Sequence, residues 1–192
     1  MQLILASTSP YRKELLTRLH IPFQTARPDA DETPLPGEMP ETLALRLASL
    51  KAESLADTFT DALIIGSDQV ATLDDIVPIG KPGTVDQAKS QLRAASGRTV
   101  TFYTGLSVFN SANGQQDALV DRYEIQFRNL TDAEIDRYIE LEQPLDCAGS
   151  FKSEGLGSAL FARHQGADPT SLIGLPLIAL CSLLQKHGMK VL

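Results

Sequence analysis

Apolar and polar residues follow two distinct spacings along this chain, and each spacing predicts a type of element. Short apolar runs between polar or glycine-rich segments, and stretches rich in Val, Phe, Tyr and Thr, predict strands. Longer segments with apolar residues three and four positions apart predict amphipathic helices. The expected strands cover about 3–6, 23–26, 63–65, 98–109 and 119–128, and the expected helices cover about 10–19, 40–57, 84–95, 131–142 and 175–187.

Capping and turn residues mark where several of these elements begin. Ser9 followed by Pro10 suits an N-cap and a first helical position. Thr84 and Thr131 each open a capping box, with Gln or Glu three residues later, and the Asn-Gly pair at 113–114 is a turn signal between two strands. The last helix is apolar enough that we expect it largely inside the core. This order of elements predicts an α/β domain around a twisted mixed sheet.

The amino-acid composition narrows the possible partners. A chain of 192 residues fits one domain, or one domain with a small lobe, and is long enough to bury a core. Hydrophobic residues make up 43% and charged residues 21% of the chain, which is typical of a folded globular protein. The 24 acidic and 17 basic residues give a formal charge of −7, which disfavours binding to a nucleic-acid polymer. A small anion needs only a few local cations.

Cysteine spacing and hydropathy indicate a reducing compartment. Cys147 and Cys181 lie far apart, and the three histidines are scattered, so we expect core thiols and no structural zinc site. The first ten residues carry no basic segment and too short an apolar run for a signal peptide. No stretch approaches the ~20 apolar residues that cross a bilayer. We therefore expect a cytoplasmic protein with no membrane segment and with reduced thiols.

The junction between the first strand and the first helix is a candidate anion site. A helix N-terminus presents free N–H groups and the positive end of its dipole. Tyr11, Arg12 and Lys13 occupy the first turn, where two cations oppose the dipole unless an anion lies between them. The segment lacks the glycines of a P-loop, so side chains that face solvent are an equal alternative.

Three single residues suit phosphate or metal chemistry. Asp68 follows the buried run 63–65, where a carboxylate either faces a ligand crevice as a base or metal ligand, or forms a turn. Lys51 falls on the apolar side of its helix and either extends to solvent or reaches into a cleft. Lys81 lies on a stiff glycine–proline loop, where a plain surface lysine is the default interpretation.

Two loops complete the candidate chemistry. The loop containing Asp31, Glu32 and Thr33 places two acids among prolines, where they are either solvated or available to Mg²⁺. The segment 150–155, SFKSEG, mixes small, charged and aromatic residues, and it suits a substrate loop and a surface loop equally well. No Ser-His-Asp or Cys-His arrangement is indicated.

Taken together, these segments resemble the motif series of the Maf-like nucleotide pyrophosphatases. The first half carries LILASTSPYRKELL, DET at 31–33, LALRLASLKA, IIGSDQV and GKP at 80–82, in family order. GRTVTFYTGLSVFN, CAGSFKSEG and LIGLPLIAL extend the resemblance over nearly the whole chain. The combination is far more specific than any single piece. It implies one domain over 1–192, with an α/β fold similar to the inosine triphosphatases and a cleft between two lobes.

The resemblance also implies roles for individual residues. Asp68 matches the family's proton acceptor, and we expect it to hold a divalent cation, Mg²⁺ or Mn²⁺, together with Glu32. The positions that separate substrate classes match Tyr11, Gln69 and Glu154. The polar positions expected to bind the phosphates match Ser7, Arg12, Lys51 and Lys81. The substrate implied is a small nucleoside triphosphate, and the implied assembly is a homodimer.

Within the family, the chain most resembles the YceF branch, which is associated with hydrolysis of N7-methyl-GTP to N7-methyl-GMP and pyrophosphate. That branch commonly carries Trp where this chain has Tyr11, which keeps an aromatic face but offers a weaker cation–π surface. Glu154 can accept the N1–H and N2–H of guanine. It serves thymine or uracil poorly, because their O2 and O4 are themselves acceptors.

Two alternatives stay open from the sequence alone. One is a dTTP/UTP pyrophosphatase of the same family, which Tyr11 and Glu154 disfavour. The other is a nucleotide-binding cell-division regulator without turnover, because members of the family have been linked to septum formation. The acids at 32 and 68 favour an enzyme, since a protein that only binds a triphosphate has no need of a metal-dependent reaction.

Overall fold

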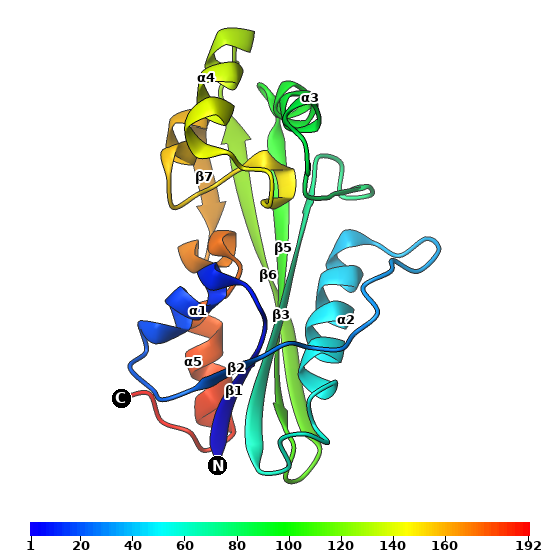
Figure 1. Cartoon of the computed structure of the whole chain (residues 1–192), viewed down its shortest axis with the longest axis vertical. Coiled ribbons are helices and arrows are strands. Elements are labelled where there is room, and N and C mark those ends of the chain that lie inside the picture. The colour runs from blue at the N-terminus through cyan, green and yellow to red at the C-terminus, as the bar shows by residue number, and fades with distance from the viewer.

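The computed structural model describes all residues, 1–192, and is built on a mixed sheet of seven strands (Figure 1). The strands are β1 (Gln2–Ala6), β2 (Gln24–Ala26), β3 (Ala62–Thr72), β4 (Pro78–Ile79), β5 (Thr99–Asn110), β6 (Gln115–Phe127) and β7 (Phe161–Gly166). Their spatial order is β2-β1-β3-β5-β6-β7, with β4 paired to β3. Strands β1 and β2, and β1 and β3, pair in parallel, and all other pairs are antiparallel. The mixed α/β architecture expected from the sequence is confirmed.

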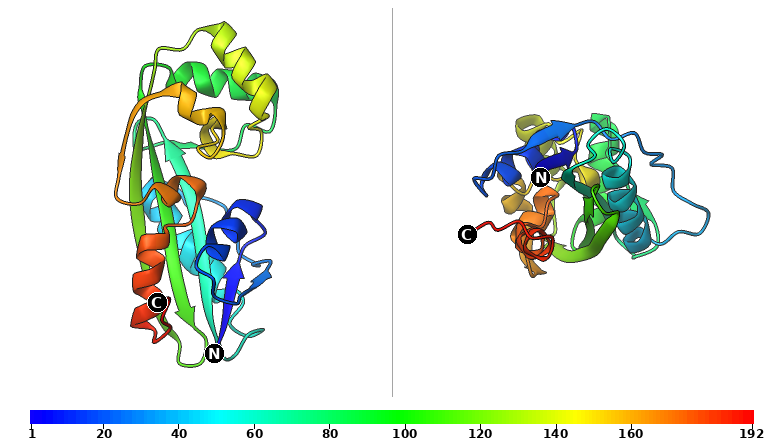
Figure 2. Two further views of the ribbon diagram at one scale, coloured as in Figure 1. Left: turned by 90° about the vertical axis from the view of Figure 1, so that its left-hand side faces the viewer. Right: turned by 90° about the horizontal axis from the view of Figure 1, so that it is seen from below.

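Helices cover the sheet in two groups. The α-helices are α1 (Pro10–Thr17), α2 (Pro40–Glu53), α3 (Val85–Ala95), α4 (Asp132–Glu142) and α5 (Leu177–Lys186), and the 3₁₀ helices are η1 (Ala148–Ser150), η2 (Leu156–Leu160) and η3 (Pro169–Ile173). Helix α2 packs on one face of the long strands and α1 and α5 lie on the other, whereas α3 and α4 gather at the far end (Figures 1 and 2). None of the helices has both the length and the hydropathy that a membrane span requires.

Each group of helices has its own core along the shared strands. At the far end, Phe102 of β5, Phe127 of β6 and Tyr138 of α4 belong to one buried cluster. At the other end, side chains of α1 and α5, including Leu15 and Leu180, pack in a second cluster with β1, β3 and β5. The long strands run through both ends, so they hold the two lobes in one frame (Figure 2).

The expected helix caps form. Ser9 Oγ accepts from the Arg12 N–H at 3.4 Å, with Pro10 at the first helical position. Thr131 and Glu134 make both bonds of a capping box at the start of α4. Thr84 Oγ1 accepts from the N–H of Gln87 in α3 at 3.2 Å, but the second bond of the expected capping box does not form. Local sequence therefore determines these three boundaries.

The sequence predicted that the strand over 63–65 ends at Gly66, and this prediction is wrong. Strand β3 continues through Gly66, Ser67 and Asp68 to Thr72, and Asp68 pairs with Gly105 of β5 in the middle of the sheet. Glycine, serine and aspartate resemble a turn in sequence, but here their backbone groups are satisfied by β5. Ser67 Oγ also donates to the carbonyl of Gly105 at 2.8 Å, so a buried polar side chain is tolerated within the strand.

Two smaller expectations also differ from the structure, and the last strand was not predicted. Helix α2 ends at Glu53, and turns replace the expected helix up to 57. Helix α5 is not largely inside the core, because only Leu180 and Leu184 are buried and Ile178 is 62% exposed. Strand β7 was not expected, and its nearly continuous exposure explains why it shows no apolar alternation.

Candidate active site

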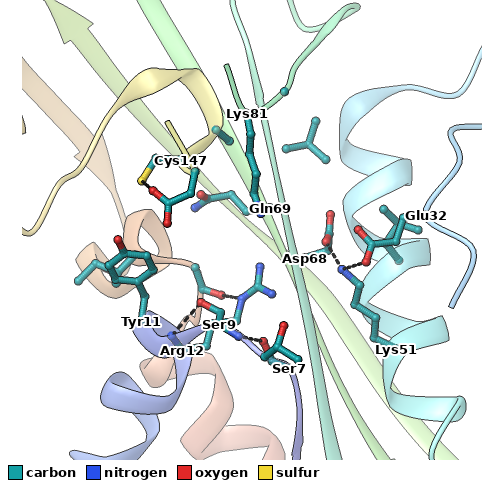
Figure 3. Close-up of a pocket in the computed structure, with 18 of the residues that line it drawn as sticks. Ser7, Ser9, Tyr11, Arg12, Glu32, Lys51, Asp68, Gln69, Lys81 and Cys147 are labelled. Carbon is teal, nitrogen blue, oxygen red and sulfur yellow. Dashed lines mark hydrogen bonds and ion pairs between the residues drawn. The ribbon is translucent and has the colours of Figure 1, made fainter. Parts of the chain in front are cut away.

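A cavity of about 500 Å³ opens between the two lobes, within the size range of small-molecule sites. Its wall is formed by the N-terminus of α1, the buried side of α2, the centre of β3, the loop after β4, the 146–154 segment and η3. Lys13, Asp31 and Thr33 do not line this cavity, but all nine residues to which the family resemblance assigns site roles do, and Figure 3 labels most of them. They are Ser7, Tyr11, Arg12, Glu32, Lys51, Asp68, Gln69, Lys81 and Glu154.

The start of α1 forms one wall through local hydrogen bonds. Ser7 Oγ accepts from the Ser9 N–H at 3.1 Å, and Ser9 in turn caps the helix. Ser7 is therefore a turn-forming residue at the cavity wall, and it is only 5% exposed. These bonds turn the helix N-terminus toward the cavity, where its free N–H groups and dipole suit an anion.

Arg12 extends from this helix into the cavity, and a backbone carbonyl holds its guanidinium in place. Its Nε donates to the carbonyl of Gly174 at 2.9 Å, and Ser67 Oγ lies 2.8 Å from the same carbonyl, which shares the one hydroxyl proton with the carbonyl of Gly105. Burial lowers the pKa of Arg12, and the negative charges of Asp68 and Glu32 raise it. Because Gly174 engages only Nε, the two terminal nitrogens of the guanidinium are free of protein hydrogen bonds and available to a ligand.

Lys51 reaches into the cavity instead of extending to solvent. It is 5% exposed, and its Nζ lies 2.6 Å from Asp68 Oδ1 and 3.1 Å from Glu32 Oε1 (Figure 3). The ammonium thus lies between the two acids that the sequence singled out. The Asp68 bond uses Oδ1, which leaves Oδ2 open to a water or a metal ion.

Two glycines let α2 lie close enough to the sheet for this contact. A Cβ at Gly66 would lie 2.0 Å from the carbonyl oxygen of Ala48, and a Cβ at Gly105 would lie 2.1 Å from that of Ala44. Any side chain at either position would push the helix away from β3 and β5. Close backbone approach, rather than turn formation, is what requires glycine at these two positions.

The side-chain amide of Gln69 makes its hydrogen bonds within the protein. Its amide nitrogen donates to Ser171 O at 2.7 Å, to Thr104 Oγ1 at 3.1 Å and to Leu172 O at 3.2 Å. These bonds fasten η3 to β3 at the cavity wall. Only the amide oxygen stays open to a ligand, so the amide nitrogen acts mainly by holding this wall in place.

Another part of the cavity brings together Tyr11, Glu154 and Asp146, which the sequence did not identify. Cys147, expected as a core thiol, is half-buried and lines the cavity there. Burial raises the pKa of Tyr11 to about 12, with further contributions from Cys147, Asp146 and Glu154. Burial is the main reason that the pKa of Cys147 is raised to about 12, and the negative charge of Asp146 raises it further. The only sequence signal for this pair is its position at the start of the CAGSFKSEG motif.

The donor set for a metal ion is limited to two carboxylates. No cluster of three or more His, Cys, Asp or Glu side chains forms anywhere in the structure. Glu32 and Asp68 face one another across Lys51 at the cavity wall. Mg²⁺ is commonly held by one or two carboxylates, with water and substrate phosphates as its other ligands. The two acids therefore fit a cation that arrives with a phosphate ligand.

Comparison with known proteins places this chain and its fold in a defined family. The structure of the *Staphylococcus aureus* Ham1 protein matches with a TM-score of 0.57, covering 97% of this chain and 100% of that chain at 13% identity, which shows a shared fold. Residues 2–187 match the family model for Maf-like protein, and the chain belongs to this family. It is also 55% identical over 193 residues to the 7-methyl-GTP pyrophosphatase of *Vibrio cholerae* serotype O1, covering 100% of this chain and 98% of that protein. The family resemblance inferred from the motifs is confirmed.

Proposed function

We propose that this protein is a nucleoside triphosphate pyrophosphatase that hydrolyses N7-methyl-GTP to N7-methyl-GMP and pyrophosphate. The observation that carries the proposal is one cavity with Arg12, Lys51 and Lys81 beside Asp68, and with Tyr11 and Glu154 also on its wall. The 55% identity to a protein named for this activity supports it.

The cationic part of the cavity binds the triphosphate. Arg12 offers its terminal nitrogens, Lys81 extends from the loop after β4, and Lys51 approaches from α2. The N-terminus of α1 adds backbone N–H groups. Catalysis here is mostly positioning and electrostatic stabilisation, as is usual in phosphoryl chemistry.

Asp68 is the general base of the proposed reaction. Its Oδ2 takes a proton from a water that attacks the α-phosphorus, and the bond from that phosphorus to the oxygen bridging the α- and β-phosphates breaks. The bridging oxygen leaves as part of pyrophosphate. Glu32 and Asp68 are the residues that would hold a Mg²⁺ or Mn²⁺ ion, which would supply Lewis-acid stabilisation of the phosphate charge. Lys51 keeps the two acids from repelling the incoming triphosphate.

Tyr11 and Glu154 bind the base. The ring of N7-methylguanine carries a positive charge, which an aromatic face and a carboxylate both attract. Burial raises the pKa of Tyr11 from 10.0 to about 12, so its hydroxyl stays neutral even in alkaline solution. Glu154 accepts the N1–H and N2–H of guanine, a pairing that the acceptor-rich edge of a pyrimidine cannot make.

Pyrophosphate release from a panel of triphosphates tests this proposal. We expect the highest kcat/KM with N7-methyl-GTP, a low value with dTTP and UTP, and loss of turnover when a chelator removes Mg²⁺ or Mn²⁺. Glu154→Gln should narrow the gap between methyl-GTP and the pyrimidines, since an amide both donates and accepts. A wild type that prefers dTTP or UTP would overturn the base assignment, and no pyrophosphate from any substrate would favour a binding protein.

The proposal extends to a cytoplasmic homodimer, which the family resemblance implies. Ile76, Val77 and Ile178 are each at least 60% exposed, which leaves apolar surface that a second copy can cover. Light scattering during gel filtration measures the mass directly. A dimer should give twice the chain mass of 20.8 kDa, whereas a value near 20.8 kDa would remove this part of the proposal.

A further inference from the structure

The charges along the cavity wall are unevenly distributed. Lys51 contacts Asp68 and Glu32, and Arg12 and Lys81 line the same cavity, so three cations accompany two acids in this part of it. Asp146 and Glu154 lie near Tyr11, where both carboxylates raise the pKa of its hydroxyl. The two acids come from one short segment that follows α4, and this segment faces the first turn of α1, where Tyr11 precedes Arg12.

Neither acid near Tyr11 is neutralised by a cation. No basic group lies within 4.0 Å of either carboxylate, in contrast to Asp68 and Glu32, which share Lys51. The nearest lysine in sequence, Lys152, donates its Nζ to the carbonyl of Glu142 at 2.8 Å instead. Unpaired acids beside a phosphate-binding cavity are unfavourable for an anionic substrate unless the substrate carries a positive charge at that end.

Cys147 orients the carboxylate of Asp146. The thiol donates to Asp146 Oδ1 with 3.5 Å between the sulfur and the oxygen (Figure 3 shows the thiol at the cavity wall). Burial keeps the thiol protonated and therefore able to donate. Asp146 is exposed, so this bond favours one direction of a carboxylate that remains in contact with solvent.

The hydrogen bonds that Glu154 accepts cannot distinguish methylated from ordinary guanine. Both bases present the same N1–H and N2–H to a carboxylate, so that pairing selects guanine over pyrimidines. The methyl group changes the ring by adding a positive charge. Tyr11 and the charge of Glu154 already attract that positive ring, and a second carboxylate adds negative potential to the same preference.

We propose that Asp146 is a specificity-determining residue whose carboxylate favours a nucleotide with a cationic base over one with a neutral base. The inference rests on the proposed function. Asp146 acts through its charge, Cys147 positions that charge, and Glu154 makes the hydrogen bonds to the ring. Removing one unit charge at the rim of a partly solvated site should change the preference for the cationic base by about tenfold.

The test compares kcat/KM for N7-methyl-GTP and GTP in wild type, Asp146→Asn, Cys147→Ser and Cys147→Ala. Asp57→Asn is the matched control, because Asp57 is an exposed acid outside the cavity. We expect the methyl-GTP to GTP ratio to fall about tenfold in Asp146→Asn and to stay at the wild-type value in Asp57→Asn. Cys147→Ser retains a donor and should keep more of the ratio than Cys147→Ala. The preference should also weaken with added salt in wild type more than in Asp146→Asn.

The outcomes separate this inference from the proposed function. If wild type prefers methyl-GTP and Asp146→Asn lowers both substrates equally, Asp146 is structural and the inference is wrong. An unchanged ratio in Asp146→Asn overturns it as well. If the ratio of kcat/KM for methyl-GTP to that for GTP is near one in wild type and in every variant, the proposed substrate is wrong. That result overturns the proposed function, and with it the inference that depends on it.

Discussion

Lys51 Nζ lies 2.6 Å from Asp68 Oδ1, and this pair joins α2 to the centre of the sheet inside the candidate active site. The two side chains are 7% and 13% exposed, so the contact is largely shielded from solvent. Glu32 completes a three-residue cluster at 3.1 Å from the same ammonium. The cation expected to bind phosphate and the two acids expected to bind a metal ion, one of them also the expected base, therefore lie in direct contact.

Replacement of Asp68 tests its role as general base. General-base assistance typically contributes 10²–10⁴-fold, so Asp68→Asn should lower kcat by at least ~100-fold. Turnover of N7-methyl-GTP is the measurement, with thermal unfolding to show that the variant is folded. Because Asn preserves shape but cannot accept the proton, a variant with wild-type turnover would exclude Asp68 as the base.

Replacement of Lys51 tests the charge balance of the cluster. Lys51→Met keeps the apolar stem but leaves Asp68 and Glu32 without their shared cation. Removing one partner of a buried pair typically costs about 3 kcal/mol or more, and we expect a loss of stability of that order. We also expect a higher KM for the triphosphate. Urea unfolding and initial rates measure the two effects, and Lys190→Met, on the C-terminal tail, is a control outside the cavity.

Replacement of Gly66 tests the close approach of α2 to β3. A Cβ there would meet the Ala48 carbonyl oxygen at 2.0 Å, and this oxygen belongs to the helix backbone, which cannot move aside as a flexible side chain can. Overpacking of this kind costs at least about 2 kcal/mol, so Gly66→Ala should unfold at lower urea. It should also lower activity by displacing Lys51. Gly80→Ala is the stability control, since nothing lies within 4 Å of its Cβ position. Equal midpoints for the two variants would contradict this packing argument.

The loop that carries Glu32 is anchored by an ion pair that depends on pH. Arg46 Nε lies 2.6 Å from Glu38 Oε1, and Arg46 also donates to the carbonyl of Thr33 at 3.1 Å. The hydrogen bond from Arg46 lowers the pKa of Glu38 from 4.5 to about 2. A lowered carboxyl pKa contributes stability that is complete above 4.5 and is lost as the pH falls toward about 2.

Denaturation of wild type and Glu38→Gln across this acidic range measures the contribution. The stability difference should be largest above pH 4.5 and should shrink as the pH approaches about 2. Asp57→Asn should show no comparable change, because Asp57 makes no ion pair. A difference that stays constant over the whole range would show that the Glu38 pair does not provide the pH dependence.

Replacement of Arg12 tests the contact with the Gly174 carbonyl. Lysine keeps the charge but lacks the planar fork, so it cannot hold that carbonyl and bind phosphate at the same time. We expect Arg12→Lys to raise KM by about tenfold, with a smaller effect on kcat, since the lost bonds hold the substrate before and during the reaction. Lys13→Arg, in the same helical turn but not at the cavity, should behave as wild type. A fall in kcat alone would instead assign Arg12 to the transition state.

The sequence by itself determined the local features of this protein. Ser9 and Thr131 cap their helices where expected, because a cap depends only on side chains and backbone a few residues apart. The apolar run at 63–65 marked a buried strand for the same reason. The motif series also supplied all nine candidate site residues that line the cavity.

Only the tertiary structure decided where those residues meet. Asp68 lies within β3 rather than after it, because pairing with β5, some 37 positions away at Gly105, outweighs the turn preference of its neighbours. Gly66 had no local signal for its contact with α2, and Asp146 gained its place beside Tyr11 from a segment at the other end of the chain. Close packing and electrostatic potential depend on distances in space, and spacing along a chain does not determine those distances.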